Sequence, residues 1–456
     1  MLDQNDTICA VATATGGALT VIRISGTNAM KAAGMVFTAK SGKPLAACAP
    51  YSSCFGQITD ENGQVLDEAI ATIFRTPHSY TGEDCVEFSC HGSVYIAQQI
   101  ISLLIMHGCR QAEPGEFTQR SFLAGKMDLS QAEAVADLIS STSAASHRLA
   151  MNQMKGGFSR KLGELRTKLT ELTSLMELEL DFSEEDVQFA DRSRLDELAA
   201  TIEQTLTTLS ASFRTGQALR NGVPVAIIGR TNTGKSTLLN LLLNDERALV
   251  SDIQGTTRDS IEDTAVINGT LFRFIDTAGI RKSDDAIEQM GIERSFQKAA
   301  QADIILLLTD CSQPEEERDT ELENKLMPIC QGKTLIRVHN KCDLLKSVPQ
   351  GSDNDIYISA KQDTNLLQLK QILVKSAPTL QPDGNDVILT NMRHFQAVNR
   401  ALDCITRVRQ GLTDGTPTDL LSQDTRECIH HLSDILGEVT TDQVLQNIFS
   451  HFCIGK

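Results

Sequence analysis

Residues 229–236 read Gly229-Arg230-Thr231-Asn232-Thr233-Gly234-Lys235-Ser236, and this stretch decides the fold of the middle of the chain. It follows an apolar run at 225–228 and opens a helical pattern. Glycines let backbone amides converge on phosphates, the lysine reaches the β- and γ-oxygens, and the serine hydroxyl binds Mg²⁺. The stretch therefore predicts a phosphate-binding loop (P-loop) between a buried strand and a helix.

Strand patterns alternate with helical patterns around this loop. The apolar runs that predict strands lie at 225–228, 272–275, 304–308, 334–338 and 356–358. Alternation of this kind is typical of a parallel, doubly wound sheet. We expect a Ras-like α/β GTPase domain over residues 221–378.

The flanking segments have a different texture. Residues 1–122 carry short strand patterns and a hairpin turn signal, Asp60-Glu61-Asn62-Gly63, which predict an α+β domain. Residues 123–220 and 379–456 carry apolar stripes at helical spacing. We expect these two stretches to form one discontinuous helical domain into which the α/β domain is inserted.

Composition excludes some classes of protein. The chain has 456 residues, enough for several cores, and no apolar run of about 18 residues that a membrane span needs, so we expect a cytoplasmic protein. Its net charge of −17 argues against holding nucleic acid by phosphate contacts alone, so any such contact is local or shared with a partner. Its 12 cysteines form no C-x-x-C pair, and we expect most to be reduced and buried.

Motifs at further strand ends complete a guanine-nucleotide site. Asp343 ends the run 340–343, where its carboxylate can accept from guanine N1–H and N2–H₂, a donor pair that adenine lacks. The run 276–279 can approach Mg²⁺ and the γ-phosphate, and 359–361 closes the base pocket. The expected GTP-binding residues are Asn232, Thr233, Gly234, Lys235, Ser236, Thr237, Ser251, Thr256, Thr257, Asp276, Thr277, Ala278, Gly279, Asn340, Lys341, Asp343, Ser359, Ala360 and Lys361.

Ile280 follows Gly279, where Ras-like enzymes carry the glutamine that orients the attacking water. An isoleucine cannot orient water, so another group must do so. Arg258 can be mistaken for an arginine finger in cis, but its place in the first switch makes an ion pair or a partner contact at least as good an interpretation.

Asn232 in the P-loop, together with Gly255-Thr256-Thr257-Arg258-Asp259, resembles the potassium-activated GTPases. That resemblance implies K⁺ bound by the side chains of Asn232 and Thr256 and the backbone oxygens of Ser251 and Ile253, with Mg²⁺ bound by Ser236 and Thr257. A cation there neutralises charge that develops between the β- and γ-phosphates. The alternative is that Asn232 only stabilises the loop.

Sequence blocks along nearly the whole chain resemble the MnmE (TrmE) family of tRNA-modification GTPases. These blocks are 6–8 with 22–26, Ser79-Tyr80-Thr81-Gly82-Glu83-Asp84, His91-Gly92, 114–118, 122–134 and Phe452-Cys453-Ile454-Gly455-Lys456. The resemblance implies a homodimer that joins the flavoprotein MnmG in a heterotetramer. That assembly modifies C5 of the wobble uridine (position 34) of certain tRNAs, giving aminomethyl or carboxymethylaminomethyl groups.

The same resemblance implies further site residues. The 1–122 domain would dimerise and bind 5,10-methylenetetrahydrofolate or another tetrahydrofolate, with the 5-formyl form as an analogue, through Arg23, Glu87, Lys126 and Lys456. Carboxylates suit the pterin donors and cations suit the glutamate tail.

Three residues are expected to be catalytic. Lys235 acts on the phosphates, and Glu288 in the second switch directs water, with Glu293 as its nearby competitor. Cys453 acts in the modification chemistry or, alternatively, only packs. The alternative function is a ribosome-assembly GTPase of the Era or Der type, which lacks the 452–456 tail.

Overall fold

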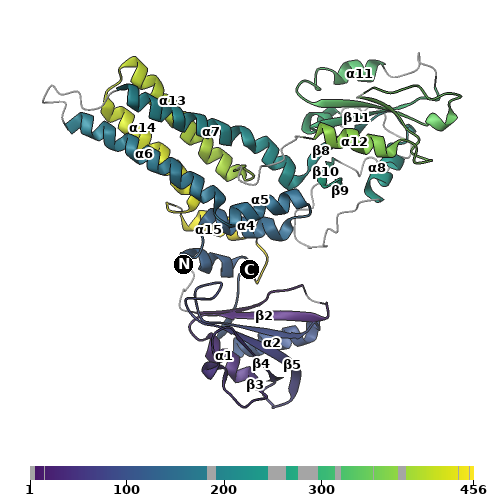
Figure 1. Cartoon of the computed structure of the whole chain (residues 1–456). Coiled ribbons are helices and arrows are strands. Elements are labelled where there is room, and N and C mark those ends of the chain that lie inside the picture. The colour runs from purple at the N-terminus through teal and green to yellow at the C-terminus, as the bar shows by residue number, and fades with distance from the viewer. Residues whose placement is uncertain are drawn as a thin grey trace. The chain divides into compact units, whose positions relative to one another are not determined.

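The computed structural model describes residues 6–14, 16–181, 192–244, 263–275, 296–313, 320–352, 354–377, 387–439, 441–450 and 452–455. The chain forms two compact units, each assembled from segments that are distant in sequence. Unit 1 comprises Met1–Ala136, Gln153–Arg166 and Ile429–Lys456, and unit 2 comprises Asp137–Asn152 and Thr167–Cys428. Figure 1 shows their elements.

Unit 1 is built around a seven-stranded sheet with the order β3-β4-β5-β6-β2-β1-β7. Its strands are β1 (Thr7–Val11), β2 (Leu19–Ser25), β3 (Phe37–Ala39), β4 (Ser52–Thr59), β5 (Val65–Phe74), β6 (Cys85–His91) and β7 (Cys109–Gln111). All neighbours pair antiparallel except β1 and β7. The predicted turn joins β4 to β5: Asp60 Oδ1 accepts from the amides of Asn62 at 2.9 Å and Gln64 at 2.7 Å.

Two helices cover one face of this sheet, and the opposite face is exposed at β4 and β5. Helices α1 (Ala29–Val36) and α2 (Val94–Met106) pack on inward residues such as Ile22, Ile58 and Phe88. A 3₁₀ turn, η1 (Leu45–Ala47), lies at the edge of the same core. On the opposite face, Phe55 of β4 and Ile70 of β5 are paired neighbours that are both exposed.

Unit 1 also contains α3 (Glu116–Leu123) and α15 (Asp442–Ser450), which pack together although they lie over 300 residues apart in sequence. Leu129, Leu445 and Phe449 form a small core beside them. Gly437 is required where it stands: its φ is +84°, and a Cβ there would lie 2.8 Å from the Phe122 ring. Helices α4 (Leu129–Ser140), α5 (Ala144–Met154) and α6 (Gly157–Asp181) follow α3 in the chain.

Unit 2 contains the second sheet, with the order β13-β12-β11-β8-β10-β9. Its strands are β8 (Val223–Ile228), β9 (Asp263–Ile267), β10 (Thr270–Phe274), β11 (Ile304–Asp310), β12 (Thr334–Asn340) and β13 (Asp355–Tyr357). Four neighbouring pairs are parallel, and β9 and β10 are antiparallel. The strand β9 is a feature that the sequence patterns did not predict.

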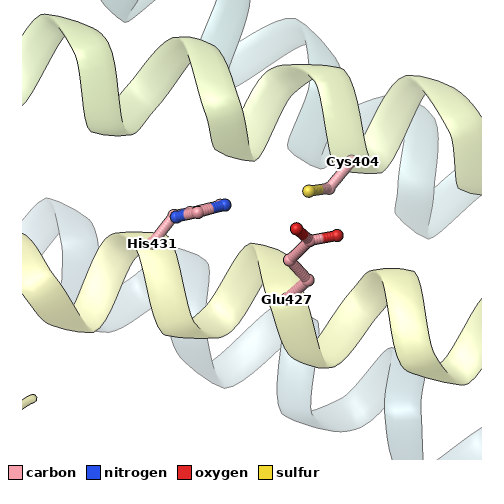
Figure 2. Close-up of side chains that lie close together, drawn as sticks. All are labelled: Cys404, Glu427 and His431. Carbon is pink, nitrogen blue, oxygen red and sulfur yellow. The ribbon is translucent and has the colours of Figure 1, made fainter.

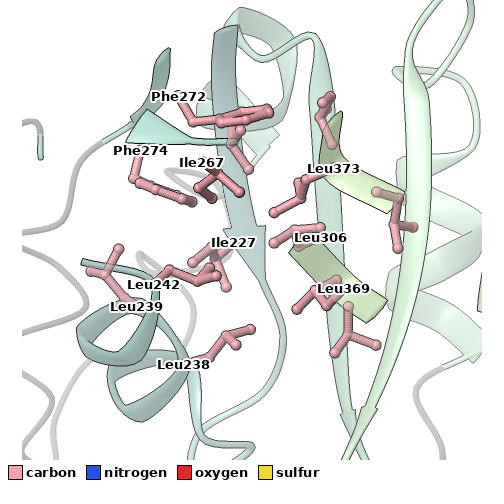
Figure 3. Close-up of a cluster of buried hydrophobic side chains, with 14 of the residues drawn as sticks. Ile227, Leu238, Leu239, Leu242, Ile267, Phe272, Phe274, Leu306, Leu369 and Leu373 are labelled. Carbon is pink, nitrogen blue, oxygen red and sulfur yellow. The ribbon is translucent and has the colours of Figure 1, made fainter. Parts of the chain in front are cut away.

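Apolar layers lie on both faces of the second sheet. Alternate β8 residues face opposite ways: Ile227 joins the layer with α8 (Lys235–Asn244) and α12 (Leu366–Ser376), which Figure 3 shows. Ile228 joins the opposite layer, which includes residues of α11 (Thr320–Leu326). Strands buried on both faces explain the continuous apolar runs in the sequence.

Helices from before and after the second sheet pack together in unit 2. These are α7 (Arg192–Asn221) and α13 (Met392–Asp414), and α14 (Thr418–Leu436) follows α13. The rings of Phe213 and Phe395 stack with centroids 4.2 Å apart. The predicted architecture is therefore confirmed: an α+β N-terminal part, a discontinuous helical part and an inserted α/β P-loop domain. The exact boundaries 1–122, 123–220 with 379–456, and 221–378 stay predictions. Within the described part of the chain, no helix is both long and apolar enough to cross a membrane.

Candidate functional site

The P-loop connects the end of β8 to the start of α8, as its sequence predicts. Gly229 and Gly234 are needed for close approach of the backbone: Cβ atoms there would lie 2.3 Å from the Leu308 carbonyl oxygen and 2.2 Å from Asn340 Nδ2. Gly234 also has a φ of +98°, a conformation that favours glycine. Any side chain at these two positions would displace the loop from the sheet.

Asn232 adopts a left-handed conformation in this loop, with φ of +62°. Asparagine tolerates this region better than most residues, so the backbone shape alone favours Asn or Gly here. The neighbouring Thr233 is buried and donates through Oγ1 to the Arg230 carbonyl at 2.9 Å. The P-loop is therefore stabilised by a hydrogen bond between two of its own residues.

The side chain of Lys235, the first residue of α8, extends back into the P-loop that precedes the helix. Its Nζ donates to the carbonyl oxygens of Gly229 at 2.8 Å and Arg230 at 2.5 Å. Burial, followed by the positive charge of Lys298, lowers the pKa of Lys235. An ammonium held in this position can donate to phosphate oxygens bound by the loop.

Asn340 joins the P-loop to the two guanine-pocket segments. It is buried at the end of β12, where Nδ2 donates to the Thr233 carbonyl at 2.8 Å and Oδ1 accepts from the Ala360 amide at 2.9 Å. One amide side chain thus holds three predicted motifs together.

Asp343 lies in the 3₁₀ turn η4 (Cys342–Leu344) with its carboxylate fixed by a hydrogen bond from Ser359 Oγ at 2.6 Å. Ahead of it, Lys341 is left-handed, with φ of +67°, and its Nζ pairs with Asp310 at 2.5 Å. Burial opposes ionisation of Asp310, but the hydrogen bonds from Lys341 and Ser312 outweigh it and lower the pKa of Asp310. The Asp343 carboxylate is therefore held in a fixed orientation at the position where the guanine base of the nucleotide is expected.

The remaining nucleotide residues are placed only in part. Ser236 and Thr237 occupy the first turn of α8, and Lys361 is exposed at the end of the run 359–361. The expected residues Ser251, Ile253, Thr256, Thr257, Asp276, Thr277, Ala278, Gly279 and Glu288 lie outside the described residues.

Arg23 and Glu87, two of the expected folate residues, form a pair in unit 1. They are directly opposed on β2 and β6, with Arg23 Nε 2.7 Å from Glu87 Oε1, and both are mostly buried. The guanidinium lies over the rings of Tyr80 and Phe117, 5.4 and 5.6 Å from their centroids. The pair is thus fixed by aromatic contacts that the sequence patterns did not reveal.

The C-terminal tail docks beside this pair. Arg23 Nη1 donates to the Gly455 carbonyl at 3.4 Å, and Ile454 bridges to Pro114. Gly455 has a φ of +93°, and a Cβ there would lie 2.3 Å from the Val11 carbonyl oxygen. The tail can therefore follow this path only with glycine at position 455.

The other expected residues of unit 1 lie around the same region. The Cys453 side chain is exposed, while its carbonyl accepts from the Gly115 amide at 3.4 Å. Lys126 Nζ donates to the Pro77 carbonyl at 2.7 Å, and so lies against the loop that carries Tyr80 rather than on the Arg23–Glu87 pair. Lys456 lies outside the described residues.

A buried ion network explains several motif residues for which the sequence patterns predicted no role. Glu116 is fully buried and pairs with Arg110 at 2.7 Å and Arg120 at 2.9 Å, and both arginines also pair with Asp6. Arg120 extends the network to Glu83 at 3.1 Å. The acidic residues within these motifs were the only sequence signal for it.

A second polar cluster lies on the helical bundle. Figure 2 shows Cys404 of α13 near Glu427 of α14, with His431 one turn further along the same helix, and these are donor types that bind zinc. However, Arg407 already donates to Cys404 Sγ at 3.4 Å and to Glu427 at 2.8 Å. Since a guanidinium neutralises the cluster, we assign no metal to it.

Comparisons with known proteins identify the family of this chain. The family described as "MnmE helical domain" matches residues 129–453, and "GTP-binding protein TrmE N-terminus" matches residues 7–126. The chain is 57% identical over 467 residues to the tRNA modification GTPase MnmE of Bacteroides fragilis, covering 99% of this chain and 100% of the relative. The same protein of Bacteroides thetaiotaomicron is 56% identical, and that of Christiangramia forsetii 47%, each with 99% of this chain covered and with 100% and 99% of the relative covered. The chain therefore belongs to the MnmE (TrmE) family of tRNA modification GTPases.

Proposed function

We propose that this chain is a potassium-activated GTP hydrolase that modifies C5 of the wobble uridine, position 34, of certain tRNAs in the cytoplasm. The observation that carries the nucleotide part is Asn340, whose side chain joins the P-loop to both guanine-pocket segments. Such a tie lets binding of the base and binding of the phosphates support each other. Family membership decides against the Era or Der alternative.

The proposed catalytic device replaces the glutamine that the chain lacks after Gly279. Asn232 and Thr256, with backbone oxygens of Ser251 and Ile253, would hold K⁺, and Ser236 and Thr257 would hold Mg²⁺. The left-handed backbone of Asn232 supports this proposal, because it fixes the direction in which that side chain leaves the loop. Glu288 would orient the attacking water.

The proposed one-carbon chemistry belongs to unit 1. A tetrahydrofolate would bind at the Arg23–Glu87 pair, with Lys126 and Lys456 available to its anionic tail. The docked C-terminal tail supports this proposal, since it brings the segment that carries Cys453 against the same strands. The folate would supply the one-carbon unit when bound, while the protein residues would orient it.

The proposed partners follow from charge and from the exposed sheet face. Two copies would meet through the N-terminal part, where exposed Phe55 of β4 and Ile70 of β5 are paired neighbours on the sheet face opposite α1 and α2. A flavoprotein partner, MnmG in the family, would complete a heterotetramer. It would supply much of the basic surface for tRNA, because this chain carries a net charge of −17.

Nucleoside analysis of tRNA tests the proposal. tRNA from cells that lack this protein should lose the C5-modified wobble uridine, and the wild-type chain should restore it. A chain with Lys235→Ala should not restore it, because that ammonium serves the GTP cycle. An unchanged nucleoside profile in the deleted cells would overturn the proposed function.

A further inference from the structure

Two cysteines of unit 1 have their thiols in contact. Cys48 ends the 3₁₀ turn η1, and Cys54 lies on β4. Their Sγ atoms are 3.1 Å apart. Since a disulfide has an S–S distance of about 2.05 Å, a bond between them requires about 1 Å of approach.

Hydrogen bonds fix the backbone around both cysteines. The Cys48 amide donates to the Leu45 carbonyl at 3.0 Å, and Arg75 Nη2 donates to the Ala46 carbonyl at 2.7 Å. Cys54 is paired with Ala71 within the β4–β5 ladder. The two sulfurs therefore stay in contact as a consequence of the fold, which gives each a high effective concentration for the other.

Access to the pair is unequal. Cys48 is buried, whereas Cys54 is only partly covered. Another thiol pair in unit 1 provides a contrast: Cys9 and Cys109 also hydrogen-bond to each other, but both are buried, with 0% and 5% exposure. A small oxidant in solution can thus meet Cys54 first and has no direct route to Cys9 or Cys109.

We infer that Cys48 and Cys54 are a site of reversible oxidation, at which a hydroperoxide converts the two thiols to an intramolecular disulfide. The Cys54 thiolate attacks the peroxide O–O bond, which leaves Cys54 sulfenic acid and releases water from H₂O₂ or an alcohol from an alkyl hydroperoxide. The Cys48 thiolate then attacks the Cys54 sulfur, which forms the S–S bond and expels the sulfenic oxygen as water, with a proton taken up from solvent. Two thiols are oxidised by two electrons and one peroxide is reduced, and a cellular dithiol reverses the step by thiol–disulfide exchange.

The reaction is expected to be slow at neutral pH. The hydrogen bond with Cys48 and then partial burial raise the pKa of Cys54, while the charge of Lys43 acts in the opposite direction. Because the thiolate is the nucleophile, the rate should rise by up to about tenfold per pH unit below that pKa. The site therefore responds to sustained rather than brief exposure to peroxide.

The position of Tyr51 between the two cysteines gives a direct assay. The full-length chain is incubated with H₂O₂ at pH 7 and pH 8.5, and catalase then stops the reaction. The protein is unfolded in the presence of N-ethylmaleimide, which blocks free thiols, and is then cleaved with chymotrypsin. Cleavage after Tyr51 separates Cys48 from Cys54 unless a disulfide joins their peptides. We expect a linked pair that dithiothreitol separates, that forms faster at pH 8.5, and that has no Cys9–Cys109 counterpart.

Variants test the order of steps. In Cys48→Ser, Cys54 should stop at sulfenic acid, which dimedone traps, and no link should form. In Cys54→Ser, Cys48 should stay a thiol. The inference is overturned if wild-type Cys54 proceeds to sulfinic acid while Cys48 is recovered as the maleimide adduct. It is also overturned if Cys9 and Cys109 become linked as fast as Cys48 and Cys54, because contact without access would then suffice.

Discussion

Asn340 Nδ2 donates to the carbonyl oxygen of Thr233 at 2.8 Å, so the end of β12 holds the P-loop in place. The same side chain accepts from the Ala360 amide. The segments proposed to bind the phosphates and the base therefore share one buried hydrogen-bonded residue.

Asn340→Ala should weaken both GTP and GDP binding. The Thr233 carbonyl and the Ala360 amide would lose their partner, at a cost of about 1–3 kcal/mol, or roughly 5- to 150-fold in affinity. Titration with a fluorescent guanine nucleotide measures the change. Asn221→Ala serves as the control, because Asn221 is exposed and its side chain donates to Gln217 of its own helix. Equal affinities for the two variants would refute the role of Asn340.

GTP hydrolysis should be severalfold faster in potassium than in sodium salts. The variant Asn232→Gly separates the two interpretations of Asn232, since glycine keeps the φ of +62° without strain while removing the amide. We expect this variant to lose the potassium stimulation while still binding nucleotide. If potassium still stimulates GTP hydrolysis by Asn232→Gly, Asn232 serves only the shape of the loop. If the wild-type enzyme hydrolyses GTP equally fast in potassium and sodium salts, the mechanism does not use a bound cation.

Glu288→Ala should retain GTP affinity but lose turnover by about 100-fold or more, as expected for a group that acts on the attacking water. Single-turnover hydrolysis with saturating enzyme separates the chemical step from binding. Glu293→Ala is the matched comparison, five residues along the same segment. If Glu293→Ala shows the larger loss, the role belongs to Glu293.

Acid should destabilise unit 1 through Glu116. Burial opposes ionisation of Glu116, but hydrogen bonds from Arg110, the Glu113 amide and Arg120 outweigh it and lower the pKa of Glu116. A lowered pKa means that the stabilisation is fully present above the unfolded value, about 4.3, and is lost as pH falls through the folded value.

Glu116→Gln should therefore cost about 3 kcal/mol near pH 7, because it leaves two arginine partners without their buried carboxylate. Below about pH 4.3 the variant should lose less further stability than the wild type. Hydrogen exchange of the β1 and β7 amides reports on this unit specifically. The exposed Glu113→Gln is the control, and identical pH profiles for all three proteins would contradict the assignment.

Two variants of the C-terminal tail distinguish a chemical role of the Cys453 thiol from a role of the tail in docking alone. Cys453→Ser should leave GTP hydrolysis intact and abolish wobble-uridine modification if the thiol is chemical, whereas normal modification would support packing. Gly455→Ala should release the tail, since its Cβ would lie 2.3 Å from the Val11 carbonyl oxygen. We expect it to abolish modification in either case while sparing hydrolysis. Nucleoside analysis and phosphate release measure the two activities, with Ser450→Ala as an exposed control in the same region.

Local chemistry made much of this structure predictable. The turn at 60–63 was predictable because Asp60 and Gly63 satisfy it without distant partners. The P-loop and the strand-end motifs were predictable because glycine, lysine and carboxylate at fixed spacing have few other uses. Strand β9 was missed because a five-residue edge strand carries little periodic signal.

Long-range relationships were not predictable from patterns. Arg120 meets Asp6 across 114 positions, and no local signal pairs a helical arginine with a residue near the N-terminus. The contact between Cys48 and Cys54 depends on how η1 meets the edge of the sheet. The resemblance supplied Arg23 and Glu87 as candidates, but their opposition required the register of β2 and β6.

The pairing of α7 with α13 also constrains how the protein is made. Gly216 of α7 lets the backbone at Leu389 pass so close that a Cβ would lie 1.9 Å from its carbonyl oxygen, and Gln217 donates to Thr390 at 2.7 Å. After α7 has been synthesised, about 170 further residues must be added before α13 begins and can pack against it. This takes roughly ten seconds or more of translation at common rates. During that interval the apolar stripe of α7 is without α13, so we expect chaperones to bind this stripe until the two helices can pack.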